Sequence, residues 1–255
     1  MDLGICDWGI GGLGLYELLK RSRPDVAVTY IGDQGSTAYS LLSKIEVEAR
    51  VEHMLRTFNR LGVTNVVFAS AAASTALDDV SVPGMSATGV IEPALRAMRG
   101  AHYREVGVIG GRRTILSGAF GRSLRKQRFC VLQRVSLDLS LAIENGQARA
   151  PETRQMLVEL LEPLVKVDCL LLACTHYRVI TPTLRELLPN AAIVDPVEAC
   201  AAEVLDRLPQ PDKQYRSDVF YTTGDPRAME KHARSAFGLD IRVQTLAAAH
   251  PELAA

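Results

Sequence analysis

The stretch LLLACTHYR, residues 170–178, shows how this chain is built. Its apolar first half is typical of a buried strand, and that strand stops at Cys174, Thr175 and His176. Ligands of open parallel sheets bind at the carboxyl ends of strands. An earlier stretch, VVFASAAAS at residues 66–74, has the same construction without the thiol and the imidazole. These two stretches predict two similar structural units, of which the second carries the reactive side chains.

Strand and helix signals alternate along the rest of the chain, which predicts βαβ units and mostly parallel sheets. The expected strands are residues 3–6, 26–33, 64–70, 105–111, 128–136, 167–174 and 191–196. The expected helices are residues 14–22, 45–61, 94–99, 151–165 and 182–188, and the tail adds a strand and a helix, with Asp225 as the N-cap. We predict an α/β fold with two doubly wound lobes. Residues 1–93 and 197–255 form the first lobe, and residues 94–196 form the second.

Composition limits the classes of function. Lysine plus arginine and aspartate plus glutamate number 29 each, so the net charge is zero, and no basic block indicates a nucleic-acid partner. No apolar run reaches the roughly 18 residues that span a bilayer, and no charged leader precedes an apolar core. We therefore expect a cytoplasmic protein with no membrane partner; a homodimer is left open.

The cysteines do not form a recognisable framework. There are five, an odd number without a CxxC pair, so neither a disulfide framework nor a structural zinc site is expected. Four of them are interpreted as buried small apolar residues, and Cys174 is the exception. Beside Cys174 no second histidine or carboxylate stands at ligand spacing, so we expect no metal.

The motif GIGGLG, residues 9–14, fits the G-x-G-x-x-G pattern of dinucleotide sites and is followed by Asp33 at the end of the next strand. Asp7 and Trp8 argue against that reading, because a carboxylate would face the pyrophosphate and an indole would crowd it. The alternative is a tight strand-to-helix turn whose glycines adopt positive φ. The start of the helix would still offer N–H groups to a smaller anion, such as a carboxylate. We expect no cofactor.

Cys174 is the candidate catalytic residue. A nearby imidazole and the N–H groups at the start of the next helix stabilise a thiolate. A thiol near neutral pH suits proton transfer at carbon. The residues alone leave open an inert Cys174 and a His176 that is only packed and hydrogen-bonded.

Five segments together resemble glutamate racemases, which belong to the cofactor-independent aspartate/glutamate racemase superfamily. They are CDWGIGGLG at residues 6–14, GVIEP at 89–93, VGVIGGRRTILSGAF at 106–120, LLLACTHYR at 170–178 and YTTGDPRAMEKHARSAFG at 221–238. The resemblance implies two α/β lobes related by a pseudo-twofold axis. A small carboxylate substrate would lie in the cleft between them, facing one catalytic cysteine from each lobe.

The resemblance assigns roles residue by residue. Cys174 matches the second catalytic cysteine, Thr175 its substrate-contacting neighbour and His176 the assisting histidine. Asp7 matches the acid that assists the first cysteine, Thr114 a threonine of the cleft, and Glu144 a carboxylate near the second cysteine, with a register uncertain by one residue.

The first lobe departs from the family pattern. The family Cys-Asn-Thr is here Ser70, Ala71 and Ala72. Asp-Ser-Gly has become Asp7-Trp8-Gly9, and Tyr-Gly has become Tyr39-Ser40. The first thiol is therefore absent, and substrate contacts are lost with it. Trp8 either fills the vacated space, stacks on a more apolar substrate, or packs at the lobe interface.

Three functions follow. The first is a glutamate racemase-like isomerase that uses Cys174 for proton transfer at the α-carbon of a small carboxylate or amino acid, with Ser70, activated by Asp7, as the second group. The second is a single-cysteine decarboxylase of the arylmalonate type, which needs only one acid. The third is a catalytically silent binding protein with the racemase fold. We predict the isomerase.

Overall fold

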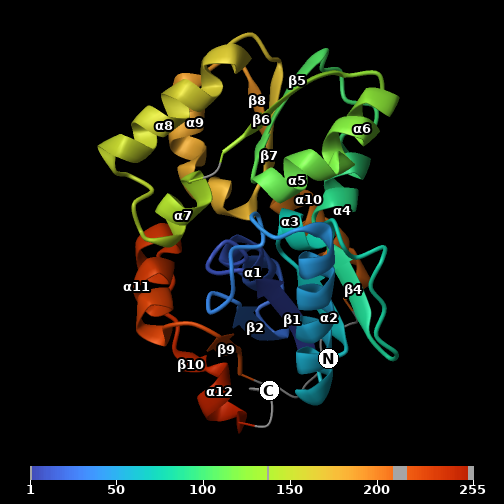
Figure 1. Cartoon of the computed structure of the whole chain (residues 1–255), viewed down its shortest axis with the longest axis vertical. Helices are drawn as coiled ribbons and strands as arrows, with labels where there is room; N and C mark the ends of the chain where they lie inside the picture. The colour runs from blue at the N-terminus through green and yellow to red at the C-terminus, as the bar shows by residue number, and fades with distance from the viewer. Residues whose placement is uncertain (1, 137, 209–216, 252–255) are drawn as a thin grey trace.

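Helices and strands alternate through the chain in the computed structural model, which describes residues 2–136, 138–208 and 217–251 (Figure 1). The strands of the first sheet are β1 (Asp2–Asp7), β2 (Ala27–Gly32), β3 (Asn65–Phe68), β4 (Ser86–Gly89), β9 (Val219–Thr222) and β10 (Val243–Thr245). Those of the second sheet are β5 (Glu105–Gly110), β6 (Cys130–Val135), β7 (Cys169–Ala173) and β8 (Ala192–Val194). All the pairings between these strands are parallel.

The two sheets share one strand order. The first runs β10-β9-β2-β1-β3-β4 and the second runs β6-β5-β7-β8. The order β2-β1-β3-β4 therefore corresponds to β6-β5-β7-β8, with β1 matching β5 and β3 matching β7. In such sheets the chain order reverses beside the first strand, and ligands bind at the carboxyl ends of the strands there. Both lobes thus present a binding edge built in the same way.

Helices cover both faces of each sheet. In the first lobe they are α1 (Leu13–Ser22), α2 (Lys44–Arg60), α3 (Ala71–Ser74), α11 (Pro226–Phe237) and α12 (Leu246–Ala249). Alternate residues of β1 belong to different cores, because successive side chains of a strand point to opposite faces: Ile5 packs in the core that contains α1, and Cys6 in the core that contains α2. The doubly wound α/β fold that the sequence predicts is therefore confirmed.

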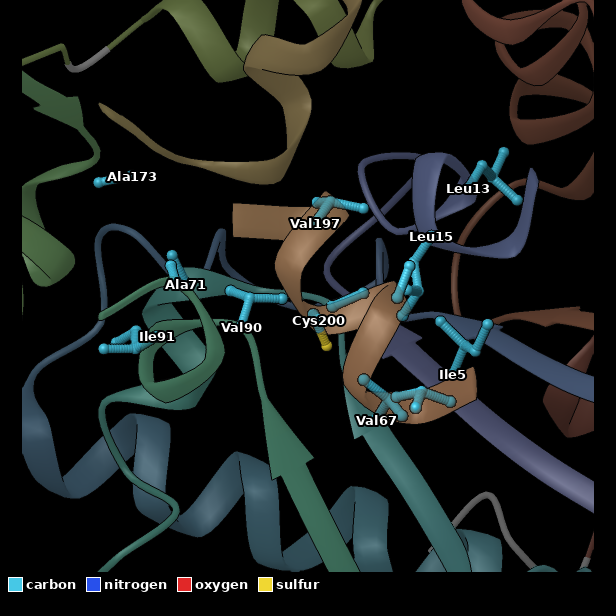
Figure 2. Packing of buried hydrophobic residues seen from close by; sticks show 14 of the residues in the cluster. Ile5, Leu13, Leu15, Val67, Ala71, Val90, Ile91, Ala173, Val197 and Cys200 are labelled. Carbon is cyan, nitrogen blue, oxygen red and sulfur yellow. The ribbon is translucent and has the colours of Figure 1, made fainter. Parts of the chain in front are cut away.

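The helices of the second lobe are α5 (Arg112–Ser117), α6 (Ala119–Lys126), α7 (Leu139–Glu144), α8 (Pro151–Leu161), η1 (Glu162–Leu164), η2 (Thr175–Ile180) and α9 (Thr181–Leu187). The lobes are joined by α4 (Ile91–Ala97) and α10 (Pro196–Arg207), which pack on each other. Figure 2 shows Val90 beside Cys200 of α10, with Ile5 and Val67 of the first sheet nearby. This core continues to Val108 and Leu171 of the second sheet. One continuous apolar core therefore places the two lobes against each other.

The expected elements lie close to the observed ones, and Asp225 caps α11 by accepting hydrogen bonds from the N–H groups of Arg227 and Ala228. One expectation about the cysteines is wrong. Cys6, Cys169 and Cys200 are buried, but Cys130 is exposed because it begins β6 at the edge of its sheet. The residue boundaries of the two lobes stay a prediction. Within the described residues no helix is long and apolar enough to cross a membrane.

Candidate active site

Ser70 and Cys174 hold equivalent positions in the two lobes. Ser70 follows β3 and is the N-cap of α3, and Cys174 follows β7 and is the N-cap of η2. Their backbone dihedral angles are similar, with φ and ψ of −142° and 120° at Ser70 and −155° and 128° at Cys174. The two matching stretches of sequence therefore fold into matching structures, and the only sulfur of the pair is on the second lobe.

One cavity lies between these two strand ends. Its empty volume, including its mouth, is about 360 Å³, which is at the lower end of the range for small-molecule sites. Eleven of the twelve predicted site residues line it: Asp7, Trp8, Tyr39, Ser40, Ser70, Ala71, Ala72, Thr114, Cys174, Thr175 and His176. The lining also includes four residues that the sequence did not single out: Ala38, Gly111, Ser140 and Ala173.

The twelfth residue, Glu144, lies behind His176. Its Oε2 is 2.6 Å from His176 Nε2, and the other ring nitrogen, Nδ1, is 3.9 Å from Cys174 Sγ. Glu144 and His176 are both buried, whereas Cys174 is partly exposed to the cavity. Burial by itself lowers the pKa of His176, but Cys174 and Glu144 outweigh it and hold that pKa well above its ordinary value. A charged imidazole beside a thiol favours the thiolate.

Asp7 ends β1 and is buried at the first-lobe side of the cavity. Its Oδ2 accepts a hydrogen bond from Thr175 Oγ1 at 2.8 Å, and its Oδ1 accepts one from the Trp8 N–H at 2.7 Å. Burial raises the pKa of Asp7 to about 6, against the opposing influence of His176 and of hydrogen bonds from Thr175, Trp8 and Ser70. A carboxyl group with such a pKa exchanges protons readily near neutral pH.

The glycines of GIGGLG accommodate the second lobe. A Cβ on Gly9 would lie 2.3 Å from the carboxylate of Glu144, one on Gly11 would lie 2.5 Å from His176 Nδ1, and one on Gly14 would lie 2.6 Å from the Arg178 side chain. None of the motif's four glycines, Gly12 included, has positive φ, so the predicted positive-φ turn is wrong. The Ile10 N–H donates to Glu144 Oε2 at 2.9 Å. The carboxylate bound in this turn, just before α1 begins at Leu13, is therefore the protein's own.

The residues that replace the family pattern form a mostly apolar wall. Trp8 is fixed by a hydrogen bond from its Nε1 to the Ser36 carbonyl at 3.0 Å, and its ring centroid lies 6.2 Å from that of His176. It therefore both lines the cavity and packs across the lobe interface. The Tyr39 hydroxyl donates to Asp33 Oδ2 at 2.7 Å, so its proton is already taken by the protein. Among the described residues, no three His, Cys, Asp or Glu side chains are grouped to hold a metal ion.

Comparison with known proteins agrees with this geometry. A profile of the Asp/Glu/Hydantoin racemase family matches residues 17–204. The chain belongs to this racemase family. Among curated members it is 32% identical to glutamate racemase from Gloeobacter violaceus, with 100% of this chain and 98% of the relative covered. It is also 32% identical to a glutamate racemase from Thermus thermophilus, with 89% of this chain and 88% of the relative covered.

Solved structures of racemases have the same fold. The RacE1 isoform of glutamate racemase from Bacillus anthracis matches with a TM-score of 0.85 at 26% identity, covering 96% of each chain. Glutamate racemase from Thermus thermophilus, in complex with β-chloro-D-alanine, matches with a TM-score of 0.83 at 29% identity, again covering 96% of each chain. This racemase family member thus keeps the family fold over nearly its whole length.

Proposed function

We propose that this racemase family member catalyses proton transfer at the α-carbon of a small amino acid or related carboxylate, as glutamate racemases do. The observation that carries the proposal is a thiol that faces an inter-lobe cavity and is backed by a buried His176–Glu144 pair. This arrangement provides a nucleophilic acid–base group without a cofactor.

On the second-lobe side, Cys174 is the acid–base group. As a thiolate it removes the α-proton, and as a thiol it returns one. His176 stabilises the thiolate with its charge, and Glu144 holds the imidazole in the orientation that directs Nδ1 to the sulfur. Thr175 contributes a hydroxyl that is held by Asp7 across the lobe boundary. The thiol and its supporting groups thus form a fixed unit.

On the first-lobe side, a Ser70–Asp7 pair replaces the absent thiol. A serine hydroxyl is too weak an acid to donate its proton and remain as an alkoxide. The carboxyl group of Asp7, a hydrogen-bond partner of Ser70, removes that difficulty. Ser70 gives its proton to the carbanion while Asp7 gives its own to the Ser70 oxygen, and the reverse steps remove a proton. Every transfer is balanced, and the charge ends on the carboxylate.

Glutamate is the first substrate to test, because the curated relatives above are glutamate racemases. The lining offers the hydroxyls of Ser40, Thr114 and Ser140 as hydrogen-bond partners for a carboxylate. Trp8, Ala71 and Ala72 form the apolar side. A small carboxylate with one less polar group than glutamate is therefore the next candidate.

Incubation with L- and D-glutamate, aspartate and substituted malonates in heavy water, followed by NMR, tests the proposal. We expect deuterium at the α-carbon with inversion, and a large loss of that exchange in Ser70→Ala. Carbon dioxide release would instead identify a decarboxylase, and no reaction with any substrate of the panel would contradict the proposal. The comparisons, which find racemases, do not favour the decarboxylase or the silent binder.

A cytoplasmic location stays a prediction from the sequence, which leaves a homodimer open. Size-exclusion chromatography with light scattering would test the assembly directly, since the chain has a mass of 27.8 kDa. A mass near twice that value would show a dimer, and a single-chain mass would show a monomer.

A further inference from the structure

Glu144 lies in the second lobe but takes two of its hydrogen bonds from the first. Its Oε1 accepts from the side-chain amide of Gln34, and its Oε2 accepts from the Ile10 N–H at 2.9 Å and contacts His176 Nε2 at 2.6 Å. Both carboxylate oxygens are therefore occupied, which fixes the plane of the group. The Gln34 contact joins residues 110 positions apart in the chain.

Gln34 is itself held by the tail of the chain. It follows β2 and precedes the cavity residue Tyr39. Its Cβ packs so closely on Gly224 that a Cβ on that glycine would lie 2.9 Å away. The next residue, Gly35, donates its N–H to Thr223 Oγ1 at 2.9 Å. The turn between β9 and α11 thus supports the loop that carries Gln34.

From these contacts we infer that Gln34 is a positioning residue that acts on Cys174 through Glu144 and His176. This inference rests on the proposed function in assigning Cys174 to proton transfer. Gln34 does not line the cavity, so it acts without touching substrate. Nothing in the sequence pattern or in the comparisons assigns it a role.

The physical reason is the charge on Glu144. A buried carboxylate stays ionised only when donors compensate for its lost hydration. Without the Gln34 amide, the Glu144 carboxylate is less well stabilised and supports the charge on His176 less strongly. Three ionisable groups face the Glu144–His176 pair. They are Cys174, beside His176 Nδ1, Asp7, across the lobe boundary, and Tyr30, which lies near Glu144. None of these donates to Glu144 Oε1 within the part of the chain that the structure describes.

Alkylation of Cys174 by iodoacetamide as a function of pH, followed by peptide mass spectrometry, tests this inference in the full chain. In Gln34→Leu we expect the pH of half-maximal alkylation to rise by about one unit, a tenfold loss of thiolate below the midpoint. The exposed Cys130 in the same molecule is an internal reference and should react as before. Gln155→Leu is the matched control, since Gln155 also donates to a glutamate, Glu159, but on the surface at 2.8 Å.

Gln34→Met is the second variant, in case Gln34→Leu does not fold. Its unbranched side chain has nearly the volume of Gln34 but no N–H donor for Glu144 Oε1, so the midpoint should also rise. An unchanged midpoint in either folded variant would overturn the inference. With a substrate that turns over, Gln34→Leu should lower kcat about tenfold and leave KM within about threefold.

The alkylation measurement needs no turnover. A midpoint shift in a protein that exchanges no substrate would therefore support the role of Gln34 and count against the proposed function. Turnover by the wild type with no shift in Gln34→Leu would support the proposed function and count against the role of Gln34.

Discussion

Replacing Gly11 by alanine tests the close fit between the lobes. The added Cβ would lie 2.5 Å from both Asp7 Oδ2 and His176 Nδ1, whereas ordinary contact begins at 3.4 Å. Each group must therefore move by up to 0.9 Å, since 3.4 − 2.5 = 0.9. Gly11 does not have positive φ, so the backbone tolerates alanine and the cost comes from this overlap alone.

Neither neighbour of Gly11 can move freely. Asp7 Oδ2 is held by Thr175 Oγ1 at 2.8 Å, and His176 Nδ1 faces Cys174 Sγ at 3.9 Å. A displacement of about 1 Å at a catalytic group can lower a rate about 100-fold. Overpacking of a filled interior costs about 1–3 kcal/mol of stability. We expect Gly11→Ala to fold with a lowered melting temperature and to lose about 100-fold in α-carbon deuterium exchange.

The assay is NMR-detected deuterium exchange, measured at a temperature where circular dichroism shows both proteins folded. Gly107→Ala is the matched control, because the atoms nearest to its Cβ would be side-chain carbons of Leu170 and Val167, at 3.2 and 3.4 Å. It should exchange within about twofold of the wild type. If folded Gly11→Ala kept more than half of the wild-type rate, the glycines would not be needed for the approach of His176.

Four further changes test the remaining assignments. Cys174→Ala should reduce exchange at least about 100-fold, and residual exchange near the wild-type rate would remove Cys174 from the mechanism. Ser70→Cys restores a thiol on the first lobe and should raise exchange about tenfold or more; a slower variant would show that Ser70 is not on the proton path. Because burial raises the pKa of Asp7 from 3.8 to about 6, its contribution to stability is complete below pH 4 and is lost as the pH rises through 6. Urea unfolding at several pH values should therefore show that the free energy of unfolding of Asp7→Asn rises relative to that of the wild type, by up to about 3 kcal/mol between pH 4 and pH 8. A difference that does not change with pH would contradict that pKa. Trp8→Ser opens the apolar wall and should lower the KM for glutamate at least about threefold, whereas an unchanged KM would place the ring outside the substrate space.

The fold and the edges of the two sheets could be read from local patterns. Apolar runs such as residues 170–173 show a buried strand whatever surrounds them, and the polar residues after them must then lie at a sheet edge. The same reasoning places Ser70 opposite Cys174 once both strands are assigned. Resemblance to the family added Asp7, Thr114 and Glu144, which no local pattern distinguishes.

Tertiary structure alone decided what joins the lobes. Gly9 and Gly11 match a nucleotide motif in the sequence, but their lack of side chains makes room for Glu144 and His176. Gln34 has no local signal, because its partner Glu144 is 110 residues away. A short stretch of sequence determines which way its own side chains point. Which distant side chain meets them depends on how two separately formed sheets pack, and that packing appears only in the complete fold.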